Sequence, residues 1–127
     1  AGSASDNKNQ LRNFGDQFGF PFPEGAGTDA EAVAQLGYWI HMTERAVALG
    51  ERLGDRFLYL RFDDLCAEPE AELRRLLEFT GVEPGDDLPA IAAKVQTPSS
   101  TGRWRDHDDR PFSEEQVEAV RRFGFAV

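Results

Sequence analysis

An apolar stretch at residues 56–62, followed at once by a helical pattern, constrains the fold of this 127-residue chain more than any other feature. Residues 57–62 read Phe-Leu-Tyr-Leu-Arg-Phe, with aromatic and aliphatic side chains on both faces, which is typical of a strand buried on both sides. The backbone of such a strand needs partner strands, and the sequence contains no second convincing one. We therefore expect an α/β fold, mostly helical with one buried parallel strand at residues 56–62, that is the C-terminal part of a larger protein.

The residues after this stretch carry the start and stop signals of a helix. Pro69 occupies a first-turn position, acidic residues follow it, and Gly81 lies just past the end. We expect the apolar face of this helix to lie against the sheet that contains the strand. That face comprises Leu73, Leu76, Leu77 and Thr80.

A longer helix is predicted earlier in the chain. The capping box Thr28–Glu31 opens it, and it ends at about Leu53, before Gly54. Two apolar stripes follow this helix, so we expect other structure to cover much of its surface. The stripes comprise Val33, Leu36, Ile40 and Val47, and Trp39, Met42, Ala46, Leu49 and Leu53.

Two shorter helices are predicted towards the C-terminus. Asp87 opens the first, and a second capping box at residues 113–116 opens the other, which ends before Gly124. The side chains that we expect these helices to bury are Leu88, Ile91, Ala92 and Val95 in the first, and Val117, Val120 and Phe123 in the second.

The first 27 residues have no long periodic segment. Residues 5–14 fit a short polar helix that Gly15 closes. The stretch from there to residue 27 is rich in Phe, Gly and Pro, so we expect a packed coil that covers a core or lines a pocket. Residues 1–4 are either a cloning remnant or a cut end.

Composition narrows the classes of partner. The formal net charge of −9 argues against nucleic acid, because phosphate neutralisation needs clustered Lys and Arg. Cys66 is the only cysteine, which excludes an internal disulfide. No apolar run approaches the roughly 20 residues that span a bilayer, and no signal-peptide pattern opens the chain. We therefore expect a soluble, cytoplasmic protein without a membrane span.

Three segments resemble, in the right order, parts of the sulfotransferases that use 3′-phosphoadenosine 5′-phosphosulfate (PAPS). Residues 59–82 resemble the family's late strand and helix, in which a Y-E-D-L-like turn precedes a helix ending in F-x-G. Residues 99–105 resemble the late G-x-W-(K/R) loop, which closes over the cofactor's 3′-phosphate. Residues 5–10 resemble the segment that opens with the family's 3′-phosphate-binding Ser. By this resemblance, residues 1–127 are the C-terminal portion of a single domain with the P-loop-type three-layer fold.

The resemblance implies transfer of a sulfuryl group from PAPS to a hydroxyl or amine of a small-molecule, lipid or glycan acceptor. It implies that this chain supplies part of the acceptor pocket and part of the 3′-phosphate site for PAPS and for 3′-phosphoadenosine 5′-phosphate (PAP). The cofactor-binding residues that it implies are Ser5, Phe62, Thr101, Gly102, Arg103 and Trp104. The family's phosphosulfate loop and catalytic base have no counterpart here and would precede Ser5, so we expect no catalytic residue and no activity from this chain alone.

Physical reasoning on the late loop supports an anion site but leaves an alternative open. Gly102 permits close backbone approach, Arg103 offers a planar fork of donors to phosphate, and Trp104 can anchor the loop or stack on a base. Alternatively, the arginines of this loop pair with acidic neighbours on the surface. The residues of that alternative are Arg103 and Arg105 with Asp106, Asp108 and Asp109.

The other two implied contacts are also ambiguous. Ser5 is either an anion ligand beside a helix N-terminus or a plain N-cap. Phe62 stands where many family members have the Tyr of the Y-E-D motif, so a hydroxyl contact is lost and a packing contact to the nucleotide remains.

Two other functions stay open, a noncatalytic helical interaction or dimerisation module and a fragment of another P-loop protein such as a nucleotide kinase. Whatever the function, the missing N-terminal half or a second copy of the chain would pair with the strand expected at residues 56–62. We expect structural or surface roles for His41 and His107, because neither has a partner placed for catalysis. Residues 106–109 make a poor preformed cation cage, so no metal site is expected.

Overall fold

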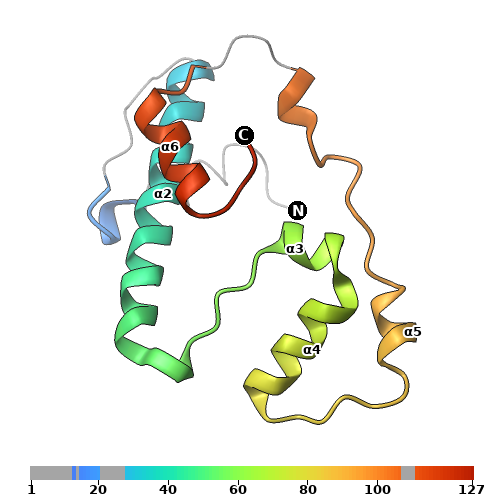
Figure 1. Cartoon of the computed structure of the whole chain (residues 1–127). Helices are drawn as coiled ribbons and strands as arrows, with labels where there is room; N and C mark the ends of the chain where they lie inside the picture. The colour runs from blue at the N-terminus through green and yellow to red at the C-terminus, as the bar shows by residue number, and fades with distance from the viewer. Residues whose placement is uncertain (1–12, 14, 21–27, 107–110) are drawn as a thin grey trace. The chain divides into compact units, whose positions relative to one another are not determined.

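The computed structural model describes residues 13, 15–20, 28–106 and 111–127, and every regular element among them is helical (Figure 1). These residues fall into two compact units, residues 1–46 with 109–127 and residues 47–108. The elements are α2 (Thr28–Leu53), η1 (Gly54–Arg56), α3 (Phe62–Ala67), α4 (Pro69–Thr80), α5 (Leu88–Ala92), η2 (Arg103–Asp106) and α6 (Glu114–Arg122).

The expected α/β fold class is wrong for the described residues, because the strand expected at 56–62 does not form. The backbone is extended at Phe57 (φ −128°, ψ 135°) and at Arg61 (φ −94°, ψ 135°). No second strand lies beside it in the described part of the chain, so no ladder of backbone hydrogen bonds can form. Phe62, the last residue of the expected strand, is the first residue of α3. The apolar face of α4 therefore has no described sheet to cover.

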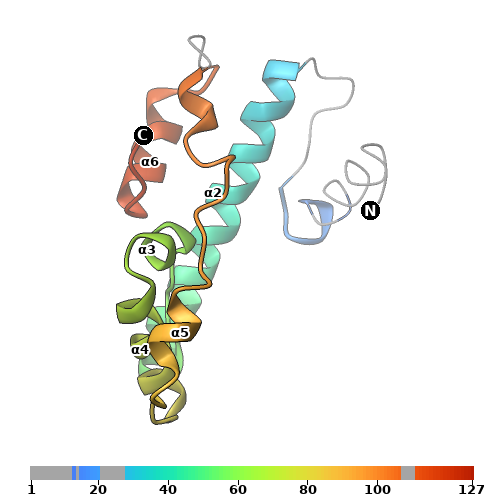
Figure 2. The same cartoon turned by 90° about the vertical axis from the view of Figure 1, so that its right-hand side faces the viewer.

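In the first unit, α6 runs beside the N-terminal half of α2 and in the same direction. Near the start of α6, Gln116 Nε2 donates to the carbonyl oxygen of Val33 at 3.0 Å. Near its end, Arg122 Nη2 lies 3.4 Å from Glu44 Oε1, eleven residues further along α2. Contacts that advance together along both helices require a parallel arrangement, which both views show (Figures 1 and 2).

Aromatic side chains make the closest packing of this unit. The Trp39 ring meets the rings of Phe123 and Phe125 edge-to-face, with centroids 5.6 Å and 5.5 Å apart. Ala34 and Ala119 are buried on the two helices. The C-terminal segment is thereby fastened to α2 by edge-to-face aromatic pairs, an arrangement that stabilises beyond the area buried.

The predicted capping box of α6 is confirmed. Ser113 Oγ accepts from the Gln116 amide at 3.2 Å, and Gln116 Oε1 accepts from the Ser113 amide at 3.4 Å. The helix ends as predicted before Gly124, whose φ of 89° provides the left-handed turn. Val117, Val120 and Phe123 are half-buried, which is less than expected.

A short helical segment at residues 15–17 precedes a turn that packs on α2. The expected closure at Gly15 is wrong, since the positive φ of 74° belongs to Gly19. The Phe20 ring lies against Tyr38 and His41, with centroids 5.9 Å and 5.8 Å away. Most of the polar helix expected at 5–14, and much of the expected coil, lies outside the described residues.

In the second unit, local signals set the helix ends correctly. Pro69 is the first residue of α4, and Gly81, with φ 73°, follows its last residue. α4 packs against both α3 and α5. Leu88 and Ala92 of α5 are buried, 3% and 5% exposed, but Ile91, which was expected inward, is 45% exposed.

Burial along the long helix is also less complete than its two stripes predicted. The bounds of α2, Thr28–Leu53, agree with the prediction. However, Leu49 is 51% exposed, and Ala34 and Gly50 are its only buried residues in the described chain. The Phe57 ring lies over Gly50, where an added methyl group would collide with it. None of the described helices is both long and apolar enough to cross a membrane.

Candidate functional site

Most of the residues implied to bind cofactor fall in the second unit. Phe62 begins α3, and Thr101, Gly102, Arg103 and Trp104 lie in and before η2. Ser5 lies outside the described residues. The described parts of the implied site are therefore the first turn of α3 and the turn that leads into η2, both in the second unit.

The first turn of α3 is set by a fork between two charged side chains. Arg61 Nε and Nη2 donate to the two carboxylate oxygens of Asp64, at 2.6 Å and 2.8 Å. Asp63 and Asp64 lie in the first turn, where the helix dipole favours negative charge. Phe62, between these groups, is 54% exposed. The Phe62 ring is therefore exposed on a turn whose backbone is held by the Arg61–Asp64 pair.

The late loop is a series of tight turns and not an irregular coil. Backbone amides of Thr101, Arg103 and Arg105 donate to the carbonyl oxygens three residues earlier, at 3.0, 3.1 and 2.9 Å. Gly102 has φ 79°, a conformation that other residues rarely adopt. The guanidinium of Arg105 lies so close to Gly102 that an added methyl group would collide with it. Glycine is therefore favoured here by the backbone conformation, and a larger residue would also displace the end of the Arg105 side chain.

Arg103 is an exposed cation of this loop. No hydrogen bond or ion pair holds it within the described part of the chain, so the alternative pairing with Asp106 is not observed. Asp108 and Asp109, the other expected partners, lie outside that part. An exposed planar fork of donors is suited to bind a phosphate oxygen pair. For Trp104, only its place in η2 is described.

One weak contact links α3 to the start of the late loop. Cys66 Sγ lies 3.9 Å from the carbonyl oxygen of Gln96, within the range of a thiol hydrogen bond. No hydrogen bond, ion pair or ring contact joins Phe62 to the described atoms of the 101–103 turn. The structure thus places both features in one unit without assembling them into a closed site.

A second group of charged residues, which sequence reasoning missed, joins the 57–61 segment to α4. Arg75 Nη2 donates to Glu72 Oε2 at 2.7 Å and to the Tyr59 carbonyl oxygen at 3.0 Å. The hydrogen bond to Glu72 raises the pKa of Arg75, and the charges of Glu72 and Asp64 act in the same direction. The i,i+3 spacing of Arg61 with Asp64, and of Glu72 with Arg75, is the signal that could have identified this group.

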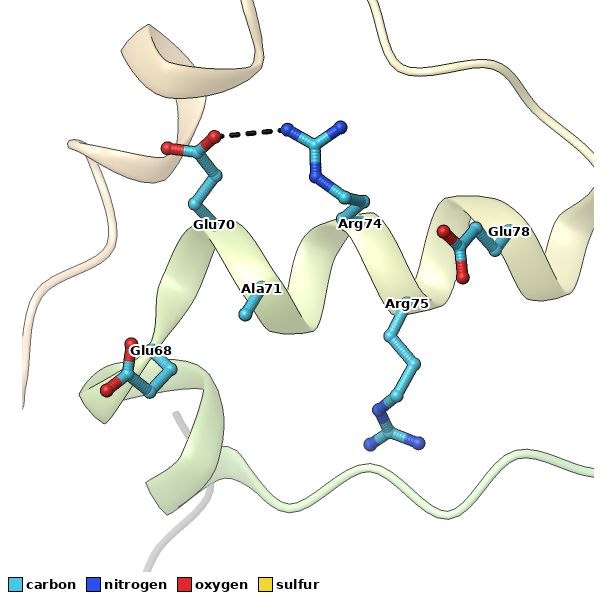
Figure 3. Close-up of a pocket in the computed structure, with 6 residues that line it drawn as sticks. All are labelled: Glu68, Glu70, Ala71, Arg74, Arg75 and Glu78. Carbon is cyan, nitrogen blue, oxygen red and sulfur yellow. Dashed lines mark hydrogen bonds and ion pairs between the residues drawn. The ribbon is translucent and has the colours of Figure 1, made fainter.

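An open depression of about 530 Å³ lies on the surface of α4 (Figure 3). Its lining residues are Glu68, Glu70, Ala71, Arg74, Arg75 and Glu78. Arg74 is paired with Glu70 at 3.1 Å, and Arg75 is paired with Glu72. Because both cations already have carboxylate partners, this depression does not form a ready anion site.

Of the two histidines, His41 has a structural contact. His41 Nε2 lies 3.0 Å from the Phe18 carbonyl oxygen, and its ring lies on Phe20, so His41 fastens the 18–20 turn to α2. His107 lies outside the described residues. Within them, no group of three His, Cys, Asp or Glu side chains could hold a metal ion.

Comparison with known proteins identifies relatives of one kind. The family described as "Sulfotransferase family" matches residues 7–87, which is more than half of the chain. Carbohydrate sulfotransferase 7 of Mus musculus is 42% identical over 57 residues, and its counterpart in Rattus norvegicus is 40% identical over 57 residues. Each match covers 45% of this chain and 11% of the relative, so the chain spans only about a tenth of the curated relatives that it matches. No solved structure matches the chain.

The family match includes only one of the residues implied to bind cofactor. Of the six residues implied to bind cofactor, Phe62 lies within residues 7–87, whereas Ser5 and the 101–104 turn lie outside that range. The comparisons thus do not bear on the assignment of the turn.

The relatives overturn the expected compartment. A cytoplasmic location was inferred from the lack of a signal peptide and of a long apolar run, and it is wrong in view of the carbohydrate sulfotransferases that this chain resembles. Those two signals carry no weight in a chain that matches 11% of its relatives' length.

Proposed function

Because the chain belongs to the sulfotransferase family, we propose that it is part of an enzyme that transfers a sulfuryl group from PAPS to a carbohydrate acceptor. The membership, which the motifs around residues 59–82 had suggested, is confirmed by the family match. The carbohydrate acceptor is supported by the names of the relatives, which are carbohydrate sulfotransferases.

We propose that this chain holds the nucleotide end of the donor. The observation that carries this role is the exposed Arg103 guanidinium, which no described residue pairs, beside a glycine with φ 79°. A doubly charged phosphate suits such a fork of donors, and the glycine lets the backbone come close to it. Arg103, Gly102 and Thr101 would hold the 3′-phosphate, and Phe62 would pack against the nucleotide. PAPS would supply the activated sulfuryl group.

The contribution of these residues to the reaction is positioning. Sulfuryl transfer, like phosphoryl transfer, needs donor and acceptor held in line and negative charge neutralised. Binding energy from the 3′-phosphate, which does not react, can be used to orient the distant sulfuryl group. Arg103 would therefore affect the reaction through the placement of the donor and not through contact with the transferred group.

Calorimetric titration of the chain with PAP tests this proposal. Arg103→Ala should weaken binding about tenfold, the loss expected for one charge-assisted hydrogen-bonding group on a phosphate. Arg45→Ala is the matched control, because Arg45 is also exposed and carries no ion pair in the described chain. Its effect should be less than about twofold, since an exposed charge that does not contact the ligand is screened by salt.

The possible outcomes distinguish failure of the proposed function from failure of the Arg103 assignment. A wild-type chain that does not bind PAP would overturn the proposed function. If PAP binds but the Arg103 and Arg45 variants lose equal affinity, the assignment of Arg103 fails and the cofactor proposal survives.

A further inference from the structure

We propose that Arg75 is a positioning residue of the nucleotide site, which holds residues 57–61 in place on α4 and thereby orients Phe62. The inference rests on the proposed function, because it assumes that Phe62 packs against the nucleotide. It concerns a residue that does not itself touch the cofactor.

The 57–61 segment has an extended backbone at both ends, Phe57 and Arg61. An extended segment normally satisfies its carbonyl groups through a neighbouring strand, and none is present among the described residues. The Tyr59 carbonyl oxygen is instead bound by Arg75 Nη2 at 3.0 Å, across sixteen residues of sequence. A side chain of α4 thus takes the place of a ladder hydrogen bond in the middle of the segment.

Glu72 holds the donor of this bond in place. Arg75 Nη2 and Nε donate to the two oxygens of Glu72, at 2.7 Å and 3.4 Å. The Glu72 side chain is only 17% exposed, which limits its rotamers and keeps the guanidinium directed at the segment. The Arg75 side chain is 40% exposed and is fixed by its hydrogen bonds more than by packing.

The other end of the segment is fixed by Arg61, whose fork holds Asp64 in the first turn of α3. Phe62 lies between these two anchors, three residues after Tyr59 and one after Arg61. If the Tyr59 anchor is lost, the segment samples other conformations and Phe62 samples other positions. Apparent affinity then falls in proportion to the fraction of molecules in the competent conformation.

The neighbouring residue Arg74 supplies a matched contrast. Arg74 is paired with Glu70 on the opposite side of α4, whereas Arg75 points towards the segment that leads into α3 (Figure 3). The two side chains are similarly exposed, 47% and 40%. They have the same charge and each pairs with a glutamate of the same helix, and of the two only Arg75 contacts the 57–61 segment.

Titration with PAP and backbone ¹⁵N relaxation, on Arg75→Met and Arg74→Met under conditions where both are folded, test the inference. Arg75→Met should weaken PAP binding about tenfold, as expected if about a tenth of the molecules keep the competent conformation. Order parameters of residues 58–61 should fall from about 0.85 towards about 0.6. Arg74→Met should change neither quantity, and Arg75→Lys should give an intermediate loss, because Lys keeps the charge but not the planar fork.

Two results would overturn the inference. One is equal order parameters at residues 58–61 in Arg75→Met and Arg74→Met, and the other is equal PAP affinity of these variants at equal folded fraction. If Arg75→Met does not fold, Arg75→Lys against Arg74→Lys decides the same question, with loss of affinity expected only in the former. Failure of the wild-type chain to bind PAP would instead refute the proposed function, while the order parameters would still show whether Arg75 holds the segment.

Discussion

The contacts inside each of the two units of this chain are of different kinds. In the unit formed by residues 1–46 and 109–127, aromatic rings join segments far apart in sequence, with Trp39 against Phe123 and Phe125. In the unit of residues 47–108, the contacts around the 57–61 segment and the first turn of α3 are charged, with Arg61 on Asp64 and Arg75 on Glu72 and the Tyr59 carbonyl.

This difference separates a unit whose described long-range contacts are mainly aromatic from a unit whose hydrogen-bonded contacts are mainly charged. Aromatic pairs stabilise through buried area and ring geometry, whereas partly exposed hydrogen bonds add little net stability but fix direction. In the second unit, Leu88 and Ala92 are the buried apolar side chains among the described residues. Among the described residues the first unit also buries two apolar side chains, Ala34 and Ala119, so the units differ in the contacts that join their segments and not in the number of buried side chains.

The largest expected effect is on the free energy of unfolding, from a substitution in the first unit. Trp39→Ala removes both edge-to-face pairs and should lower the free energy of unfolding by about 2 kcal/mol, less than for a fully buried Trp. Urea unfolding followed by circular dichroism measures the loss. Leu49→Ala, at a 51% exposed position of the same helix, is the control and should cost less than about 1 kcal/mol. Equal losses would contradict a stabilising role for the aromatic cluster.

A smaller effect is expected in the second unit, where two glycines can be compared. Gly102 and Gly81 both have positive φ, 79° and 73°, but only at Gly102 would an added methyl group meet a side chain, Arg105. Each change to Ala should cost about 1 kcal/mol of stability through the left-handed backbone. Only Gly102→Ala should also weaken PAP binding, by about threefold, because it displaces the turn that carries Arg103.

Titration and thermal unfolding of the two glycine variants give both quantities. A Gly81→Ala variant that loses as much PAP affinity as Gly102→Ala would contradict the division between a binding turn and a structural helix end.

The helix ends were predictable from the sequence because they depend on local chemistry. Pro69 fits a helix only in its first turn, Gly81 can take the left-handed conformation after one, and Ser113 with Gln116 forms a reciprocal cap. Each of these signals acts within a few residues. The structure follows them closely at α2, α4 and α6.

The strand was not predictable from the same kind of signal. The residues at 57–62 have the composition of a strand, but a strand exists only where another segment supplies the ladder, which no local pattern encodes. Instead, Arg75 binds the Tyr59 carbonyl, and Phe62 turns into α3. Only Asp63 and Asp64, which suit the first turn of a helix, indicate that Phe62 is helical. The apolar residues before Phe62 favour a strand more strongly than these two acids favour a helix.

The implied site was predictable in part. The choice of Gly102 was based on close approach of the backbone, and its φ of 79° gives the position a second requirement for glycine. The role of Arg75 was not predictable, because a partner sixteen residues away in sequence is a property of the fold. Ser5 stays a prediction from resemblance.

The central proposal, that Arg103 binds the 3′-phosphate of the cofactor, is tested most directly by changing protein and ligand together. Adenosine 5′-monophosphate lacks the 3′-phosphate of PAP, so the two ligands and the wild-type and Arg103→Ala chains form a cycle that isolates one contact. The wild-type chain should bind PAP at least about tenfold more tightly than adenosine 5′-monophosphate, and Arg103→Ala should lose most of that preference, because Thr101 and the Gly102 backbone keep only their weaker contacts with the phosphate. An Arg103→Ala chain that keeps the full wild-type preference for PAP would contradict the proposal.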